Sequence, residues 1–277
     1  MYLKRYYDLK YKIDMDSEKD LVAIIMAGGL GKRMNSDLPK VLHKIADVPM
    51  ICHILSKLND VDSSESSVKK VMIVVGKYRE IIEETINSFS HLYTKYLDEI
   101  QYIDQFEPMG TGHAIQCCRS ELLKYPNTNV LILSGDVPLI SSSLMTKMVK
   151  DVNNLRIAVT CLEDSTGYGR IVEQDEKFDK IVEEKDCDTI QKTIKKVNCG
   201  LYAFDCNILC RYLPYLKNNN SQNEYYLTDI IEIIKCEQHI EEVEMYEISK
   251  ESQHEIMGVN TLQQLEELEK YIIPSKN

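Results

Sequence analysis

The sequence predicts an α/β fold in which helices flank a mixed, mostly parallel central sheet. Three short apolar runs each end at or just before a glycine: residues 21–27, 71–76 and 130–134. Uninterrupted apolar runs are typical of parallel strands that are buried on both faces. Helices are expected between these runs, at about 49–59, 80–88 and 112–124. Because strands and helices alternate with short turns, we expect right-handed crossovers, with ligands bound beyond the carboxyl ends of the strands.

The second half of the chain predicts a lobe built onto the same sheet. Short strands of alternating polarity are expected at 156–161, 169–173, 180–184 and 195–204. Helices are expected at about 205–216 and 226–236, followed by a strand near 240–248 and an amphipathic helix over 261–271. Because neither a repeat nor a flexible linker separates the halves, we expect one domain over residues 21–277, preceded by a charged, tyrosine-rich extension over residues 1–20.

The composition favours an ordinary globular protein of the cytoplasm. With 277 residues, 44% of them apolar, the chain can bury a core without a disulfide or a zinc ion. The nine cysteines are scattered and form no C-x-x-C pair, so we expect reduced structural thiols. No apolar run approaches the ~20 residues of a membrane span, and the N-terminal residues lack the apolar centre of a secretion signal. We therefore expect a cytoplasmic protein with no membrane partner.

The net charge of −11 disfavours binding to nucleic acid or to an anionic membrane through a broad surface. Small phosphates remain compatible with this charge, because a local group of cations and backbone N–H groups can hold them on an acidic protein. Residues 27–34, AGGLGKRM, form such a group directly after the first apolar run. Its glycines allow a sharp turn and a concave nest of N–H groups. They are Gly28, Gly29 and Gly31.

Two well-known phosphate-binding loops do not fit this segment. A Walker A loop requires serine or threonine after its lysine, whereas Lys32 is followed by Arg33. A dinucleotide-binding G-x-G-x-x-G loop would have its third glycine where Met34 stands. A tight turn without any ligand remains the alternative for the loop taken alone.

The segment that follows carries the first family resemblance. Residues 31–43 are GKRMNSDLPKVLH. The fixed φ of Pro39 presents Lys40 from a stiff backbone, so that Lys40 and Arg33 can point at one polyphosphate. This segment resembles the sugar nucleotidyltransferases, and specifically the uridylyltransferase domain of the bacterial bifunctional N-acetylglucosamine-1-phosphate enzyme.

Seven further segments extend the resemblance along nearly the whole chain from residue 21. In chain order they are 105–114, 134–139, 167–171, 181–186, 197–200, 224–229 and 258–260. Any one of them could arise by chance, but seven in order with compatible spacing are specific. The resemblance implies a Rossmann-like nucleotidyltransferase fold, with a nucleotide-binding half at about 21–150 and a sugar-binding half at about 151–277.

The resemblance also implies a reaction, in which UMP passes from UTP to N-acetylglucosamine-1-phosphate and pyrophosphate is released. The attacking phosphate is already an anion, so the obstacle is electrostatic and no general base is needed. Arg33 and Lys40 would be the catalytic residues that neutralise the phosphates. The nucleotide would be bound by the three loop glycines, by Gln105 and by the backbone of Gly110 and Thr111.

The same resemblance assigns a magnesium site and a sugar pocket. Asp136 and Asn260 would bind Mg²⁺, which typically takes one or two protein oxygens and completes its shell with phosphates and water. Gly169, Glu183 and Asn198 would bind the sugar. On the residues alone, Asp136 could instead cap a turn, Glu183 could lie in a solvated strand, and Asn198 could form a turn.

Several positions depart from the pattern of the uridylyltransferase domain. Gly28 and Lys32 stand where alanine and threonine are usual, so the choice of nucleotide is less certain than the class of reaction. Pro108, Ser134 and Cys199 replace a glutamine, a tyrosine and a threonine. UTP or dTTP with glucose-1-phosphate, or with another sugar-1-phosphate, is therefore one alternative. A catalytically silent regulatory subunit with this fold is the other.

The last residues contain nothing that resembles the hexapeptide repeats of the acetyltransferase domain found in the bifunctional enzymes. We therefore expect no acetyl transfer. Because that domain normally builds the trimer, the oligomeric state stays open.

Overall fold

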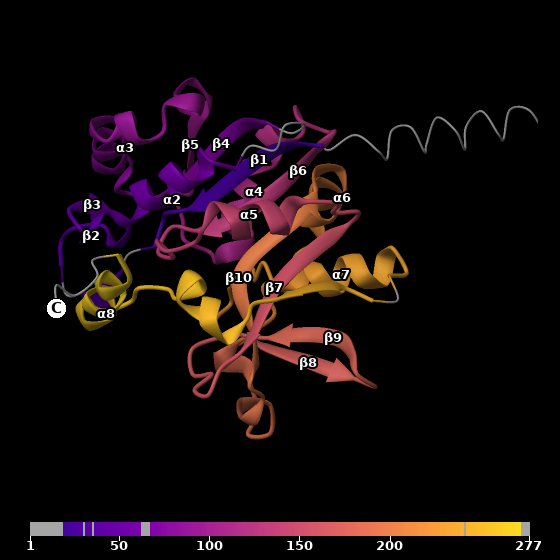
Figure 1. Cartoon of the computed structure of the whole chain (residues 1–277). Coiled ribbons are helices and arrows are strands. Elements are labelled where there is room, and N and C mark those ends of the chain that lie inside the picture. Colours follow the sequence, from indigo (N-terminus) through magenta and orange to yellow (C-terminus); the bar gives the residue numbers. More distant parts are fainter. Residues whose placement is uncertain (1–18, 30, 35, 62–66, 241, 273–277) are drawn as a thin grey trace, which may run out of the picture.

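A computed structural model describes residues 19–29, 31–34, 36–61, 67–240 and 242–272 of the chain (Figure 1). The expected extension over residues 1–20 lies outside the described residues, apart from Lys19 and Asp20. Asp20 already belongs to the first strand, and the Lys19 ammonium lies 2.7 Å from the carboxylate of Asp205. The sheet therefore begins one residue earlier than the sequence predicts.

Within the described residues, one sheet of nine strands runs through both halves of the chain. Its main path has the order β11–β7–β10–β6–β1–β4–β5, and the hairpin β8–β9 pairs with β10. The strands are β1 Asp20–Met26, β4 Val68–Val75, β5 Ile100–Asp104, β6 Thr128–Ser134, β7 Leu155–Cys161, β8 Arg170–Gln174, β9 Lys177–Val182, β10 Lys196–Asp205 and β11 Glu244–Glu247. Four of the six pairings along the main path are parallel, whereas β10 is antiparallel to both β6 and β7. The mixed, mostly parallel sheet predicted from the sequence is confirmed.

Helices cover both faces of this sheet (Figure 1). They are α2 Met50–Leu58, α3 Arg79–Ser88, α4 Thr111–Leu122, α5 Ser142–Val149, α6 Cys206–Tyr212, α7 Asp229–Glu237 and α8 Leu262–Ile272. Successive residues of a strand point to opposite faces. Ala23 and Ile25 of β1 accordingly pack with α2, α3 and α5, whereas Val22 and Ile24 pack with α4, α6 and α7.

The sequence predicts the central strands correctly but misses several elements, among them β5 and α5. The three apolar runs form β1, β4 and β6, because their cores are buried on both faces. Strand β5 lies at the sheet edge, and its five residues are all half-buried, so its sequence shows neither an apolar run nor alternation. The eight-residue helix α5 was also not predicted. The helix expected at 205–216 ends at Tyr212, because Pro214 diverts the chain into a 3-10 turn over Leu213–Tyr215.

The parallel pairing of β1 with β6 sets the position of the candidate site. It brings the carboxyl ends of the two strands side by side, with Gly28 two residues beyond one and Asp136 two residues beyond the other. The Gly135 N–H donates to the Met26 carbonyl at 2.9 Å. A Cβ at Gly135 would lie 2.8 Å from that carbonyl oxygen, so this close approach requires glycine.

A small third core joins the C-terminal helix to the loop after β1. It consists of the buried residues Met34, Ile45, Met50, Val259 and Leu268. Helix α8 lies beside the small hairpin formed by β2 (Lys44–Ile45) and β3 (Val48–Pro49) (Figure 1). Because Met34 follows Arg33 and Val259 precedes Asn260, this core fixes the backbone next to two candidate site residues.

We expect Leu268→Ala to lower the free energy of unfolding by about 2–5 kcal/mol, because it leaves a cavity beneath Met34 and Val259. Denaturant unfolding followed by circular dichroism measures the change. Leu262→Ala is the matched control, since Leu262 begins the same helix with a side chain that is 49% exposed. Its cost should stay within about 0.5 kcal/mol. Equal losses in the two variants would contradict the packing of α8 described above.

Candidate active site

Four polar side chains from three distant segments meet beyond the carboxyl ends of β1 and β6. The ammonium of Lys40 forms an ion pair with the carboxylate of Asp136. The same ammonium lies 2.7 Å from the amide oxygen of Asn260. The guanidinium of Arg33 donates to that amide oxygen as well, also at 2.7 Å. The structure therefore brings together both predicted catalytic residues and both predicted metal ligands.

The loop over residues 27–34, called the glycine loop below, positions the cations Arg33 and Lys40. Gly31 has a φ of +58°, and a Cβ there would lie 2.7 Å from the Cβ of Lys40, so only glycine allows the loop to pass this close. Pro39 has a φ of −51° and precedes a 3-10 turn over Lys40–Leu42. The next two side chains of that turn, Val41 and Leu42, are buried in the main core. The backbone beneath Lys40 is thus anchored, while its side chain extends toward Asp136.

The carboxylate of Asp136 is held by neighbours on both sides. The Ser134 hydroxyl donates to Asp136 Oδ1 at 2.7 Å, which leaves Oδ2 facing Lys40. The Val259 N–H donates to the Asp136 carbonyl at 2.9 Å and so brings Asn260 opposite the carboxylate. Gly258 passes beside the carboxylate, where a Cβ would lie 3.8 Å from Oδ1. The position of the predicted metal ligands therefore depends on main-chain contacts between segments far apart in the sequence.

These donor atoms suit a divalent cation and a polyphosphate. A carboxylate and an amide oxygen converge on one ammonium, and such oxygens are the ligands that Mg²⁺ prefers. No cluster of three or more His, Cys, Asp or Glu side chains with metal-binding geometry occurs in the described ranges. A metal held by Asp136 and Asn260 would therefore take its remaining ligands from phosphates and water.

Residues 105–111, called the base loop below, contain the predicted nucleotide-binding residues Gln105, Gly110 and Thr111. This loop lies beside the glycine loop. The Gln105 amide donates to the Gly110 carbonyl at 3.1 Å and contacts the His113 ring at the same distance. Its oxygen faces Gly28, since a Cβ there would lie 3.4 Å from Gln105 Oε1. Gln105 thus links the two loops, and its amide nitrogen already bonds within its own loop. This places Gly28 and Gln105 side by side. Gly29 is exposed, and apart from its chain neighbours no atom of the described residues lies within 4 Å of the position a Cβ would take.

Helix α4 begins at this loop and contacts a segment from the second half. Gly110 precedes the helix with a φ of +104°, and a Cβ there would lie 2.5 Å from the Tyr225 carbonyl oxygen. That carbonyl accepts from the Gly112 N–H at 2.7 Å. The Thr111 hydroxyl accepts from the Leu227 N–H at 3.1 Å. The side chain of Thr111 therefore ties the base loop to residues 224–229, and its backbone remains the group proposed for the nucleotide.

The residues predicted to bind the sugar, Gly169, Glu183 and Asn198, lie around the end of β9. The sequence predicts Glu183 inside a strand over 180–184, but β9 ends at Val182 and Glu183 follows it directly. A Cβ at Gly169 would lie 3.5 Å from Glu183 Oε2, so the backbone of Gly169 passes close to this carboxylate. The Asn198 N–H donates to the Gly169 carbonyl at 2.9 Å. These three residues are therefore neighbours, although they come from three segments.

The side chain of Asn198 is used inside the protein. Its Nδ2 donates to the Tyr202 hydroxyl at 2.6 Å, and its Oδ1 accepts from the Gly200 N–H at 3.2 Å. These bonds span an irregularity in β10, where the pairing with β7 shifts between Asn198 and Tyr202. An amide offers two donor hydrogens and two acceptor lone pairs, so one of each is left for a ligand. Cys199 is buried beside it, and burial raises the pKa of its thiol.

Three residues near the site had no role in the sequence prediction. The Thr228 hydroxyl donates to Glu183 Oε1 at 2.9 Å and orients that carboxylate. Burial raises the pKa of Tyr168, and the nearby Cys199 and Asp136 add to the shift. Ser134 holds Asp136. All three fall within the family-like segments, but only the folded structure shows which atoms they touch.

Carboxylates are concentrated around Glu183, one of the residues predicted to bind the sugar. Burial raises the pKa of Glu183, the Thr228 hydroxyl opposes that shift, and Asp186 and Glu224 add to it. Asp229 is half-buried at the start of α7, and its pKa rises from 3.8 to about 6. Burial is the main cause, and Glu183, Glu232 and Asp186 contribute. Folding therefore brings acidic groups together that would repel one another when ionised.

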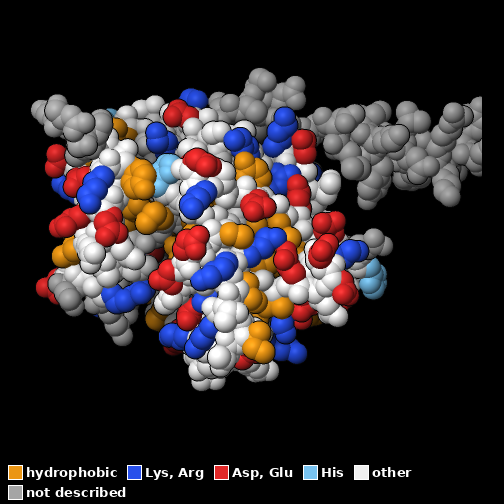
Figure 2. Space-filling view, turned by 60° about the horizontal axis from the view of Figure 1, so that its bottom comes forward, with side chains coloured by type: hydrophobic (Ala, Val, Ile, Leu, Met, Phe, Trp, Pro, Cys, Tyr) orange, Lys and Arg blue, Asp and Glu red, His pale blue; other side chains and the backbone are white. Residues whose placement is uncertain are grey.

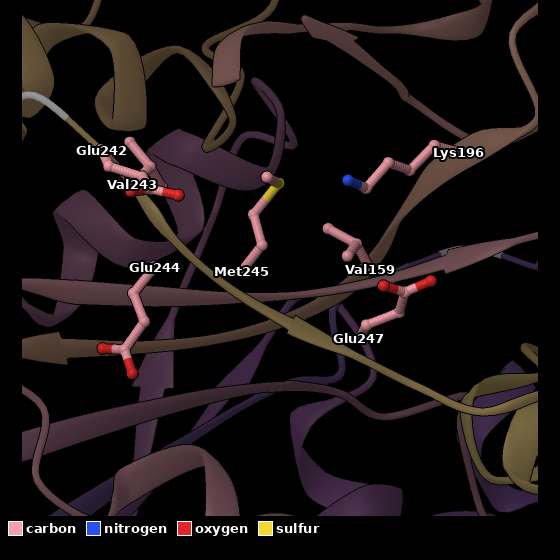
Figure 3. Close-up of a pocket in the computed structure, with 7 residues that line it drawn as sticks. All are labelled: Val159, Lys196, Glu242, Val243, Glu244, Met245 and Glu247. Carbon is pink, nitrogen blue, oxygen red and sulfur yellow. The ribbon is translucent and has the colours of Figure 1, made fainter. Parts of the chain in front are cut away.

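A hollow at the far edge of the sheet does not suit a phosphate. It is lined by Val159, Lys196, Glu242, Val243, Glu244, Met245 and Glu247 (Figure 3). Three glutamates against one lysine would repel a polyphosphate. The hollow lies at β11, four strands from β1 in the sheet order, so it is remote from the glycine loop.

The surface carries charges of both signs. Figure 2 shows Lys and Arg side chains interspersed with Asp and Glu over the face it presents, which fits the expectation that cations act locally rather than as a broad basic field. None of the helices in the described part of the chain is long and apolar enough to span a membrane.

Comparison with known proteins agrees with this geometry. A profile of the MobA-like NTP transferase domain matches residues 23–197. The bifunctional protein GlmU of Clostridium botulinum (strain 657 / Type Ba4) is 40% identical over 252 residues, which cover 89% of this chain and 51% of that protein. An Acanthamoeba polyphaga mimivirus protein named as a probable UDP-N-acetylglucosamine pyrophosphorylase is 36% identical over 254 residues, covering 90% of this chain and 95% of that protein. This chain thus spans about half the length of the GlmU protein.

A solved structure shares the fold. A Bacillus anthracis protein, described as a glucose-1-phosphate thymidylyltransferase and solved in complex with a sucrose, has a TM-score of 0.66 to this chain. The likeness covers 93% of this chain and 96% of that one at 19% sequence identity. At so low an identity, it shows the nucleotidyltransferase fold and nothing about the substrate.

We expect the free energy of unfolding of the parent protein to fall, relative to that of the Asp229→Asn variant, as the pH rises. A raised carboxyl pKa means that the folded state holds the proton more tightly, so stability is lost as the pH rises from 3.8 through about 6. A shift of that size corresponds to at most about 3 kcal/mol, and screening at a half-buried group reduces it to about 1 kcal/mol. Urea unfolding at about pH 5 and pH 8 measures the difference.

The control for this prediction is Glu237→Gln, at the exposed end of the same helix. It should show a clearly smaller dependence on pH, because its carboxylate is solvated. A stability difference between parent and Asp229→Asn that is the same at both pH values would contradict the prediction.

Proposed function

Because the chain belongs to the family of MobA-like NTP transferase domains, we propose that it transfers UMP from UTP to N-acetylglucosamine-1-phosphate, giving UDP-N-acetylglucosamine and pyrophosphate. The observation that carries the proposal is the convergence of Arg33 and Lys40 with Asp136 and Asn260 beside the glycine loop. The names of the relatives at 40% and 36% identity support this pair of substrates.

The chemistry requires positioning and neutralisation of charge. A phosphate oxygen of the sugar-1-phosphate attacks the α-phosphorus of UTP, the bond to the β-phosphate oxygen breaks, and pyrophosphate leaves. Two anions must approach each other, and further charge develops on the α-phosphoryl oxygens. Arg33 is exposed and its planar guanidinium can bind two phosphate oxygens, whereas Lys40 supplies a mobile point charge. Both lie where phosphates held by the loop N–H groups would pass.

Asp136 and Asn260 would hold Mg²⁺ in this proposal. The fit rests on their converging oxygens, which already contact one cationic group in the structure. A bound Mg²⁺ would supply charge that neutralises the phosphates of the nucleotide. Ser134 and the Val259 backbone would orient the ligands, since they hold the carboxylate and the main chain of Asp136.

The sugar assignment draws on the residues around Glu183. Its carboxylate is oriented by Thr228 and can accept hydrogen bonds from ring hydroxyls. Asn198 has one amide hydrogen and one lone pair free for the acetamido group. Cys199 sits beside it as a buried apolar neighbour. These features favour N-acetylglucosamine-1-phosphate over glucose-1-phosphate.

The alternatives fare less well. A catalytically silent subunit would have no need for two cations placed against two metal-type ligands, yet Lys40 contacts both Asp136 and Asn260 here, and Arg33 contacts Asn260. dTTP as the nucleotide rests on the departures at Gly28, Lys32 and Pro108 alone. A cytoplasmic location stays a prediction.

We expect UTP with N-acetylglucosamine-1-phosphate to give the highest kcat/KM when pyrophosphate release is measured across a matrix of nucleoside triphosphates and sugar-1-phosphates. Glucose-1-phosphate should be poorer by about one to two decades. It leaves buried polar groups without partners, each at about 1–3 kcal/mol, and ~1.4 kcal/mol is tenfold. Asn198→Ala should shrink this gap more than it raises the KM for UTP.

Tyr202→Phe is the matched control, since it removes the internal partner of Asn198 and keeps the amide. It should retain most of the selectivity. Equal or better turnover of glucose-1-phosphate by the parent protein would overturn the sugar assignment and leave the reaction class intact.

We expect activity to require a divalent cation, and Asp136→Asn to lower kcat at least ~100-fold, the scale of losing a key electrostatic group. Asp20→Asn is the control, because Asp20 lies at the opposite end of β1 and pairs with Lys69 at the surface. Its kcat should remain that of the parent. Full activity in excess chelator, or an unaffected Asp136→Asn enzyme, would refute the metal role.

A further inference from the structure

The hydrogen bonds at Asp136 and Asn260 assign a special place to Lys40. Asp136 Oδ1 accepts from Ser134, and Oδ2 accepts from Lys40. Asn260 Oδ1 accepts from both Lys40 and Arg33. An amide oxygen has two lone pairs, so both are in use. Lys40 is therefore the one donor shared by the two oxygens that would bind a metal, among the contacts of the described residues.

We propose that Lys40 is a built-in cation that competes with the divalent ion for Asp136 and Asn260, so that the metal binds tightly only after nucleotide phosphates draw Lys40 away. The inference rests on the proposed nucleotidyltransferase function and deepens it. The proposal predicts that nucleotide and metal bind together. It also predicts that the oxygens of Asp136 and Asn260 always have a cationic partner, first Lys40 and then the metal.

Competition follows from position and from charge. The ammonium contacts both ligand oxygens, so a metal ion cannot approach either closely while Lys40 remains there. The Lys40 side chain is only 11% exposed, and the charges of two cations this close would repel one another strongly. A carboxylate that is 21% exposed is also costly to leave without a partner, so release of Lys40 requires a replacement cation or a new anion for the ammonium.

The local structure allows the ammonium to move while the loop stays in place. Lys40 begins a 3-10 turn whose next residues, Val41 and Leu42, are buried in the main core. The four-carbon stem of lysine has rotatable bonds and carries a single point charge. Arg33 differs, because among the described residues its guanidinium donates to Asn260 and makes no bond to Asp136. Phosphates held at the glycine loop would lie near both cations and would attract them.

The first test measures binding of Mn²⁺ without nucleotide, by the electron paramagnetic resonance signal of the free ion. Lys40→Met should bind Mn²⁺ at least about tenfold more tightly than the parent. Arg33→Met is the matched control, because it removes one positive charge from the same amide and leaves Lys40 in place. The affinity of Arg33→Met for Mn²⁺ should exceed that of the parent by less than about threefold. Adding Asp136→Asn to Lys40→Met should abolish the gain, which ties the binding to this site.

The second test uses the unmodified protein and covers the case in which Lys40→Met does not fold. Saturating Mn²⁺ alone should raise the rate at which an amine-reactive reagent labels Lys40, measured by peptide mass spectrometry. Lys44 is the internal control, since it lies four residues away, is exposed and should label at an unchanged rate. A labelling rate at Lys40 that does not change would overturn the proposal.

The two tests separate this inference from the proposed function. Unchanged Mn²⁺ affinity in Lys40→Met, or an equal gain in Arg33→Met, would show that Lys40 acts only through its charge or as a fixed structural partner. The proposed function fails instead if no nucleotide sugar forms in the substrate matrix, and that outcome leaves the Mn²⁺ measurements unaffected.

Discussion

The ion pair between Lys40 and Asp136 is the contact on which the candidate site depends. It joins residues 96 positions apart, and the ammonium also reaches Asn260, 220 positions from Lys40. Charges with little exposure persist only where partners replace water. The fold provides these partners through main-chain contacts: the end of β6 lies against the end of β1 through Gly135, and Val259 bonds to Asp136. The small core under α8 then holds the backbone on either side. Arg33 and Lys40, two cations that would repel each other, are thereby held close together against Asn260.

A second constraint couples the two halves of the chain. The base loop and residues 224–229 approach so closely that Gly110 has no room for a Cβ next to Tyr225. Two residues further on, the Leu227 N–H reaches the Thr111 hydroxyl, and Thr228 holds Glu183 in the sugar pocket. One short segment therefore touches the nucleotide loop at one end and a sugar residue at the other. A change in the position of the base loop would therefore be transmitted directly to the Glu183 carboxylate.

The sequence predicts those parts of the fold that depend on local pattern. β1, β4 and β6 were predictable because an uninterrupted apolar run leaves few other possibilities, whereas the half-buried edge strand β5 carries no such pattern. The candidate site follows the same division. Arg33, Lys40, Asp136 and Asn260 were identified through family-like segments, and the structure brings them together. Their direct contacts, and the use of the Asn198 amide by Tyr202, depend on tertiary packing that no spacing along the chain reveals. Whether each residue performs its predicted role is a matter for the variants proposed above.

Ser134 shows how a departure from the family pattern can be absorbed at such a site. A serine hydroxyl stands one bond beyond Cβ, so it can reach a carboxylate two residues along the chain, and here it donates to Asp136 Oδ1. A tyrosine hydroxyl at this position would stand at the far end of a ring and could not make the same short local bond. The serine therefore orients the carboxylate from within its own turn, with Oδ2 directed at Lys40. The role of Asp136 can stay the same while the group that holds it changes, because what the site requires is the direction of one carboxylate oxygen.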